Sequence, residues 1–528
     1  MWAQSPYVSE VWVADLGNGT YKNPVLYADY SDPDICRAGD DYYMTSSSFN
    51  CIPGLQILHS KDLVNWQIVS AAIPYALEPR AVSERPQHGN RVWAPSIRYH
   101  KGLFYIFWGD PDYGIYMTKA GNPSGRWSEP VLIKAGKGLI DATPLWDDGG
   151  RVYLVHAFAG SRAGLKSVLA VCELNPDATE AITESRIVFD GHEGNETVEG
   201  PKFYKRDSLY YIFAPAGGVA TGWQLVLRSR SPYGPYESKT ALAQGKTNVN
   251  GPHQGAWVDT KTGEDWFFHF QDVGAYGRIV HLQPMRWIDG WPVIGEDKDG
   301  DGCGEPVGRY RKPNVGASYP VCTPKESDEF DDTAIGLQWQ WHADFNPKWI
   351  FADAANSRIK LYSHLVALDC KNLWDVPNLL LQKTPAPSFT ATTKMTFRPS
   401  SRYEGERTGL VVIGLDYGAL IMENTARGLV LSQVECKDAD KGNKETVNEE
   451  LLLEDADVYL RVTFDNDAKC RFGYSMDNKK YATFGRPFQA REGKWIGAKV
   501  GVFCTRPAIA TNDGGWVEID WFRITGEK

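Results

Sequence analysis

The amino-acid sequence predicts an all-β protein in which a five-bladed β-propeller is followed by a β-sandwich domain. Three observations lead to this fold class. Short aromatic strands recur at similar spacing up to about residue 295, turn-forming residues separate them, and a different strand spacing begins near residue 326. Antiparallel strands joined by tight turns of Gly, Pro, Asn and Asp leave no room for long helices.

The repeated unit is a short strand rich in aromatic residues. It occurs five times, at residues 42–45, 104–107, 152–155, 210–213 and 266–269. Successive copies lie about 50 to 60 residues apart, and a β motif with a period in this range is typical of propeller blades. The innermost strand of each blade runs along a central channel, so residues at the same place in each repeat are expected to meet there.

Ahead of each aromatic strand stands a residue that can carry chemistry or contact a ligand. In chain order these are Asp32, the Trp93-Ala94-Pro95 segment, Asp141, Glu199 and His253. Three of these places hold carboxylates, and the propeller geometry predicts that they share one pocket.

Taken singly, each of these residues also has a plainer interpretation. Asp32 precedes a proline in a common turn pair, and its neighbours Asp29 and Asp34 fit structural roles better than catalytic ones. Asp141 also fits a strand cap, and Glu199 a solvated loop carboxylate. His253 alone would more often be a buried core histidine. The matching places in different blades favour the shared pocket.

Four segments are predicted along the chain. Residues 1–19 form an N-terminal extension, 20–295 the propeller, 296–325 a turn-rich and proline-bearing linker, and 326–528 the sandwich. Sandwich strands are expected at residues 390–397, 408–415, 429–436, 458–464 and 516–524. In the linker, Asp297, Asp299 and Asp301 imitate the start of a calcium-binding EF-hand loop. Position twelve of that loop is Gly308 and no helices flank it, so a polar turn is the preferred interpretation.

Composition and charge narrow the classes of protein. A net charge of −10 argues against nucleic-acid binding, which needs a basic surface. The nine cysteines form no CxxC pair and are predicted to be mostly buried thiols. No apolar run is long enough for a membrane-spanning helix. The first residues lack the features of a signal peptide, which fits a cytoplasmic protein, or a periplasmic or extracellular one whose signal peptide was removed. The oligomeric state stays open.

Five stretches of the sequence, one in each repeat and in the same order, resemble glycoside hydrolase family 43. They are residues 23–49, with NPVLYADYSDPD, residues 91–108, with RVWAPS, residues 139–158, with LIDATP, residues 198–218, with VEGPKF, and residues 277–287, with GRIVHLQPMRW. Residues 328–341 and 515–524 resemble the concanavalin-A-like, jelly-roll sandwich that follows the propeller in the β-xylosidase and α-L-arabinofuranosidase branch of this family.

The resemblance implies a role for seven residues. By it, Asp32 is the general base, Glu199 the general acid, and Asp141 the carboxylate that orients the acid and raises its pKa. His253 is implied to be a ligand of a cation in the channel, Ca²⁺ or Na⁺, with no organic cofactor. Arg278 is a substrate-binding residue, and Phe49 and Trp93 wall the sugar subsite, although these three also fit ion pairing or core packing.

Two positions depart from the branch best known for xylosidase activity. That branch has aromatic residues where this chain has Cys51-Ile52, and a histidine where it has Lys202. Both positions are expected to border the entrance or the subsite. The departures therefore shift the expectation slightly toward α-L-arabinofuranosidase activity, with the preference between arabinose and xylose left open.

The expected function is hydrolysis of a terminal pentose, α-L-arabinofuranose or β-D-xylose, from oligosaccharides of arabinoxylan, xylan, xyloglucan or arabinan. Inversion needs a protonated acid and an ionised base on opposite faces of the sugar, about 6.5–9.5 Å apart. The alternative is a non-catalytic carbohydrate-binding propeller, which would gain little from burying three like charges together. A fructan-type propeller hydrolase is disfavoured because Asp29-Tyr30-Ser31 precedes the Asp-Pro pair.

Overall fold

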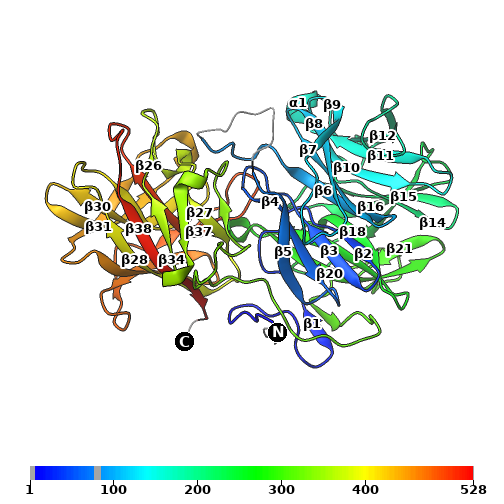
Figure 1. The fold of residues 1–528 in the computed structure, drawn as a ribbon. Helices are drawn as coiled ribbons and strands as arrows, with labels where there is room; N and C mark the ends of the chain where they lie inside the picture. Colours follow the sequence, from blue (N-terminus) through cyan, green and yellow to red (C-terminus); the bar gives the residue numbers. More distant parts are fainter. Residues whose placement is uncertain (1–5, 76–84, 527–528) are drawn as a thin grey trace.

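The computed structural model describes residues 6–75 and 85–526, which form two β lobes packed side by side (Figure 1). The first lobe is a five-bladed propeller and the second is a sandwich of two eight-stranded sheets. Within the described ranges, the only α-helix is the single turn α1, Gly160–Ala163. The predicted fold class is confirmed.

Each blade is a four-stranded antiparallel sheet built from consecutive strands. The blades are β2–β5 (Asp34–Ala38, Asp41–Thr45, Gly54–Ser60, Trp66–Ile73), β6–β9 (Trp93–His100, Leu103–Asp110, Gly114–Ala120, Val131–Ala135), β10–β13 (Leu139–Trp146, Val152–Phe158, Val168–Leu174, Arg186–Asp190), β14–β17 (Lys202–Arg206, Leu209–Ala216, Trp223–Ser229, Glu237–Leu242) and β18–β21 (His253–Asp259, Asp265–Asp272, Arg278–Ile288, Trp291–Ile294).

The recurring aromatic strand is the second strand of every blade, and its rings pack on the next blade. Tyr43 meets Phe104 with ring centroids 5.0 Å apart, and Phe213 meets Phe267 at 6.0 Å. Phe268 of the last blade reaches Trp66 of the first at 5.9 Å, which closes the ring of blades. Large rings in edge or offset contact fill the wedge between twisted sheets, and this explains why the sequence repeats them.

The ring is also tied by chain that precedes the first blade. Leu26 exchanges backbone hydrogen bonds with Val280 of β20, and the Tyr21 hydroxyl donates to the Leu282 carbonyl at 2.8 Å. Farther out, β1 (Thr20–Lys22) pairs with β22 (Arg309–Arg311) from the predicted linker. The segments before and after the blades are thus part of the packed structure.

The sandwich encloses its own apolar core between two sheets. One sheet runs β23 (Gln340–Trp341), β27 (Leu380–Lys383), β37 (Lys499–Arg506), β29 (Arg407–Ile413), β30 (Tyr417–Thr425), β31 (Gly428–Cys436) and β32 (Thr446–Leu452), with β26 (His364–Leu365) beside β37. The other runs β24 (Ile350–Asp353), β25 (Arg358–Tyr362), β38 (Trp516–Thr525), β28 (Phe389–Arg398), β33 (Asp457–Phe464), β34 (Lys469–Ser475) and β35 (Ala482–Thr483), with β36 (Phe488–Gln489) beside β34.

Buried polar groups hold the two lobes together. Arg91 of the propeller and Asp344 of the sandwich form a buried ion pair with two hydrogen bonds. Ile52 and Trp341 exchange backbone hydrogen bonds like neighbouring strands. Apolar side chains also cross the junction: Tyr276 of the propeller lies in the sandwich core, and Phe345 of the sandwich packs against the cluster that contains Ile52. Separating the lobes would expose these side chains to water. The lobes are therefore expected to behave as one folding unit.

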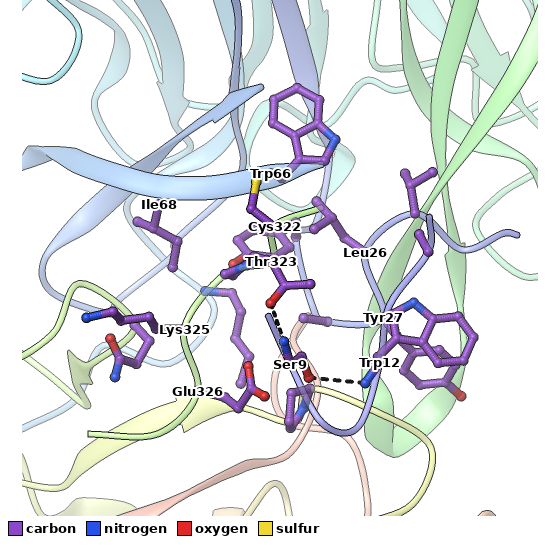
Figure 2. Close-up of a pocket in the computed structure, with 18 of the residues that line it drawn as sticks. Ser9, Trp12, Leu26, Tyr27, Trp66, Ile68, Cys322, Thr323, Lys325 and Glu326 are labelled. Carbon is purple, nitrogen blue, oxygen red and sulfur yellow. Dashed lines mark hydrogen bonds between the residues drawn. The ribbon is translucent and has the colours of Figure 1, made fainter. Parts of the chain in front are cut away.

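A second junction lies where the N-terminal segment, the first blade, the linker and the sandwich meet around a cavity of about 60 Å³ (Figure 2). The Ser9 amide donates to the Thr323 hydroxyl at 2.8 Å, and the Ser9 hydroxyl accepts from the Trp12 amide at 3.1 Å. Glu326 lines the same cavity with 4% of its surface exposed. Burial raises the pKa of Glu326 to about 7.

This carboxyl is expected to make the junction sensitive to pH. Its pKa of about 7 in the folded chain lies above its ordinary value of 4.5. The contribution of Glu326 to stability is therefore complete below about pH 4.5 and is lost as the pH rises through 7. The resulting change in the free energy of unfolding is at most about 3 kcal/mol. Glu326→Gln should raise the melting temperature at pH 8 relative to wild type and lose that advantage at pH 5.

The measurement is thermal unfolding of both proteins between pH 5 and pH 8.5. Glu329→Gln is the matched control, because that carboxylate is half exposed in an ion pair with Arg523. The control should follow the wild-type curve at each pH. A constant difference between Glu326→Gln and wild type across the range would contradict the assignment.

Two further expectations concern cysteines and membranes. All nine cysteines lie in the described residues as free thiols, and six of them are buried. Over residues 6–75 and 85–526, no helix has the length and apolar character needed to cross a membrane.

Candidate active site

The channel side of the propeller opens into a pocket of about 280 Å³. All seven residues named from the sequence line it: Asp32, Phe49, Trp93, Asp141, Glu199, His253 and Arg278. Seven further residues complete the wall, namely Ala94, Ile140, Thr197, Gly218, Val219, Gln254 and Trp495. Every blade contributes residues to this pocket, as expected when residues at the same place in each propeller repeat meet at the central channel.

A left-handed backbone residue recurs at this pocket in every blade. The φ angles are 55° at Asp32, 32° at Ala94, 58° at Asp141, 56° at Gly200 and 37° at Gln254. The inner strands of three blades also carry register shifts here, between Trp93 and Ser96, Ile140 and Thr143, and His253 and Ala256. Strained backbone of this kind concentrates at functional sites. Here it turns the residues at the start of each inner strand toward the channel.

Asp32 is buried, and its carboxylate receives three side-chain hydrogen bonds. Ser47 Oγ donates to Oδ2 at 2.5 Å and Ser31 Oγ donates to the same oxygen at 3.1 Å. Arg278 Nη1 donates to Oδ1 at 3.1 Å. These donors hold the carboxylate in one orientation at the pocket, which is what a general base requires.

Asp141 and Glu199 form an electrostatically linked pair of carboxyl groups. Burial raises the pKa of Asp141 well above its usual range, and the charges of Glu199 and then Asp32 raise it further. The Gly200 amide donates to Asp141 Oδ2 at 2.8 Å, which binds Asp141 to the residue next to Glu199. Like charges this close cannot all ionise easily, so the pair tends to keep a proton, which a general acid requires.

His253 is fully buried and holds Glu199. Its Nε2 lies 2.9 Å from Glu199 Oε1, while Nδ1 is buried without a hydrogen-bond partner in the described structure. An imidazole nitrogen left free in this way fits a ligand of a cation or an acceptor from water. The residues thus fit a cation beside His253, and its presence stays a prediction.

The acidic turn in the linker fits the interpretation made from the sequence. The carboxylates of Asp297, Asp299 and Asp301 have oxygens within 4.8 Å of one another. Asp297 accepts from the Gly300 and Gly302 amides, and Asp301 accepts from the Cys303 amide. These bonds are those of a polar turn, and Asp299 and Asp301 are exposed.

Arg278 begins β20 and lies at the floor of the pocket. Its guanidinium donates to Ser31 Oγ at 2.7 Å as well as to Asp32, and lies 4.8 Å from the centre of the Phe270 ring. Its Nε is buried without a hydrogen-bond partner among the described residues. This Nε lies 3.9 Å from Asp272 Oδ2, so Arg278 orients Asp32 from one side and faces a second carboxylate on the other.

Three aromatic residues form one side of the pocket. Phe49 and Trp93 meet edge to face at 6.4 Å, and Trp93 meets Trp495 at 6.4 Å in the same manner. Trp495 comes from the sandwich, between β36 and β37, and 46% of its surface is exposed. Sequence reasoning missed Trp495. The one available signal was a tryptophan in the loop-like Gly-Lys-Trp-Ile-Gly stretch, 493–497.

The placement expected for the two departures was wrong. Cys51 and Ile52 are buried between the lobes, where the Cys51 thiol accepts from Lys499 Nζ at 3.0 Å. Lys202 is fully buried and donates to the Pro95 carbonyl at 2.9 Å, and its charge acts against the raised pKa of Asp141. None of the three lines the pocket wall. An aligned position does not reveal which way a side chain points, so these departures carry no argument about sugar preference.

Known proteins with similar sequences and structures are glycosidases. The chain is 37% identical to a putative beta-xylosidase of Xylanibacter ruminicola, over 93% of this chain and 87% of that protein. It is 31% identical to a non-reducing end alpha-L-arabinofuranosidase of Bacteroides ovatus, over 81% of each. A crystal structure of a family 43 protein from Bacillus licheniformis matches with a TM-score of 0.82 at 27% identity, over 96% of this chain and all of that one.

Family models divide the chain where the structure does. Residues 21–292, the propeller, match glycosyl hydrolases family 43. Residues 327–525, the sandwich, match the beta xylosidase C-terminal concanavalin A-like domain. With seven residues of the resembled motifs gathered in one pocket, the chain belongs to glycoside hydrolase family 43 and is a glycosidase.

Proposed function

We propose that this glycosidase is an exo-acting, inverting enzyme that releases terminal β-D-xylose, α-L-arabinofuranose or both from plant cell-wall oligosaccharides. The observation that carries the proposal is the pocket itself. A buried, hydrogen-bonded carboxylate faces a linked pair of carboxyl groups, and an aromatic side closes the space between the two lobes.

In the proposed mechanism, Asp32 takes a proton from a water molecule as that water attacks the anomeric carbon. Glu199 gives its proton to the departing glycosidic oxygen. The bond from the anomeric carbon to that oxygen breaks while the bond to water forms on the opposite face, so configuration inverts. Arg278 and Ser47, which donate to Asp32, hold its carboxylate in place for this transfer.

His253 orients Glu199 in this proposal, and Asp141 keeps the acid supplied with a proton. Burial and the charge of Glu199 raise the pKa of Asp141, so a proton is retained within the pair of carboxyl groups. A cation such as Ca²⁺ or Na⁺, when bound at His253 Nδ1, would add positive charge to the channel beneath the site. Both proton transfers use only side chains of this chain.

Exo action follows from the shape of the pocket. Trp495 approaches from the sandwich and, with Trp93 and Phe49, closes one side. A site closed on one side admits the end of a saccharide chain and excludes its middle. The aromatic rings suit stacking against the apolar faces of sugars.

The substrate class is proposed from relatives. They include enzymes named for β-xylosidase and for non-reducing-end α-L-arabinofuranosidase activity, which supports a terminal pentose of xylan, arabinoxylan, xyloglucan or arabinan fragments. No observation favours the alternative of a non-catalytic binding propeller, and three carboxylates around one pocket disfavour it.

Two measurements test the proposal. Initial rates on 4-nitrophenyl α-L-arabinofuranoside and β-D-xylopyranoside should show hydrolysis of at least one, which separates an enzyme from a binding protein and ranks the sugars. Proton NMR of the first sugar released, before mutarotation, should show the inverted anomer. A retained anomer would make Asp32 or Glu199 a nucleophile and overturn the base and acid roles of these two residues.

A further inference from the structure

Asp29 lies outside the pocket, yet its carboxylate joins three segments that build it. Oδ1 accepts from the Arg278 amide at 2.9 Å, and Oδ2 accepts from the Gly497 amide at 3.0 Å. Asp29 itself stands three residues before Asp32, and only 5% of its surface is exposed. A single buried side chain therefore binds the base segment, the arginine segment and the sandwich segment that carries Trp495.

The backbone around Asp29 shows how closely these segments are fitted. A Cβ on Gly277 would lie 2.6 Å from Asp29 Cγ and 2.7 Å from the Gly497 nitrogen, and φ at Gly277 is 73°. A Cβ on Gly497 would lie 2.7 Å from the Gly277 nitrogen. Glycine is required on both sides, since any side chain would force the two backbones apart.

The contact continues beyond Asp29. The Ala498 amide donates to the Ala275 carbonyl at 2.7 Å, so the segment after Trp495 runs beside the segment before Arg278. The Gly493 amide donates to the Ile496 carbonyl at 2.7 Å, which closes the turn that presents Trp495. Trp495 itself is half exposed, and its ring lies against Trp93 and the backbone of Gly89, so its placement depends on how the two lobes are docked.

We propose that Asp29 is a positioning residue that sets the placement of Trp495 relative to Arg278 and Asp32, and thereby the binding of the oligosaccharide substrate. A carboxylate can accept from two amides at once, one on each oxygen, and each is a charge-assisted bond. An asparagine has one acceptor oxygen and would turn N–H groups toward a backbone N–H. Asp29→Asn should release the Gly497 amide or the Arg278 amide.

This inference rests on the proposed function, and the experiment separates the two. Values of kcat and KM are measured for wild type, Asp29→Asn, Trp495→Ala and the double variant, on xylotriose or arabinotriose, whichever the wild type cleaves faster. Each single variant should lower kcat/KM about tenfold, mainly through KM. If Asp29 acts through Trp495, kcat/KM of the double variant should lie no more than about twofold below kcat/KM of the less active single variant.

Tyr276→Phe is the matched control, because the Tyr276 hydroxyl bonds across the same interface: it accepts from the Ala468 amide and donates its one proton to the Pro387 or the Asp465 carbonyl. It should lower the melting temperature and leave KM unchanged. Additive losses in the double variant would overturn the proposal, as would a change in KM for Tyr276→Phe equal to that for Asp29→Asn.

Hydrogen exchange of the wild-type chain gives a readout that needs neither a folded variant nor activity. The Gly497 amide should exchange as slowly as amides of strand β37, although it lies in a loop beside a half-exposed tryptophan. Exchange as fast as that of exposed turns would overturn the role of Asp29. If the wild type cleaves neither trisaccharide while its Gly497 amide exchanges slowly, the proposed function would be refuted and the contact made by Asp29 would stand.

Discussion

Glu199→Gln is expected to lower kcat on unactivated oligosaccharides by about 10²–10⁴-fold, the range that a general acid contributes. The amide keeps the shape of the side chain and its contact with His253, but has no proton to give to the leaving oxygen. Binding should persist, so KM or a measured Kd should change little. Aryl glycosides need less protonation of their leaving group and should lose much less.

Steady-state kinetics on a trisaccharide and on its 4-nitrophenyl counterpart provide the measurement. Glu196→Gln is the matched control: it lies on the same loop, three residues earlier, is exposed, and does not line the pocket. It should leave both activities unchanged. An equal loss on the two substrate types for Glu199→Gln would count against the acid assignment.

Removal of the sandwich, by ending the chain after about residue 320, is expected to give an insoluble or nearly inactive product. The propeller alone would expose Arg91 without Asp344, Ile52 without its strand-like partner, and Asp29 without the Gly497 amide. Tyr276 and Ile52, which pack with apolar residues of the sandwich, would become exposed, and exposed apolar patches of this kind favour aggregation. The site would also lose Trp495.

Soluble yield, circular dichroism and activity of the truncated chain are compared with those of full-length Trp495→Ala. The point variant separates the loss of the pocket wall from the loss of stability, since it should fold normally and bind oligosaccharide more weakly. A truncated propeller that folds and keeps full exo activity would show that the sandwich is an independent module.

The blades were predictable because their signal is local and repeated. An aromatic second strand recurs with each blade, and the rings are needed wherever neighbouring sheets pack, as with Tyr43 on Phe104 and Phe268 on Trp66. The three carboxylates followed from the same regularity. Residues at the same place in each repeat lie at or near the start of the innermost strand of a blade. The left-handed backbone at these places directs Asp32 and Asp141 into the channel.

Sequence reasoning failed where the role of a residue depends on the direction of its side chain or on a contact with a distant segment of the chain. Cys51, Ile52 and Lys202 occupy aligned positions next to site motifs, but none of them lines the pocket. Packing buries the first two in the interface between the lobes and directs Lys202 to the Pro95 carbonyl. Asp29 was assigned a structural role beside Asp32, and nothing in the sequence indicated that its partner amide would come from Gly497.

The sequence alone therefore determined the fold class and the shared place of Asp32, Asp141 and Glu199, because these are written in a repeating local pattern. The resemblance to family 43, carried by local motifs, added Phe49 and Arg278 to the same pocket. Tertiary structure decided how the pocket is closed. Trp495 reaches Trp93 only because the lobes dock through Arg91, Asp344 and the glycine contact at Gly277 and Gly497. Docking of this kind depends on the shapes of two folded surfaces, which no short segment of either lobe encodes.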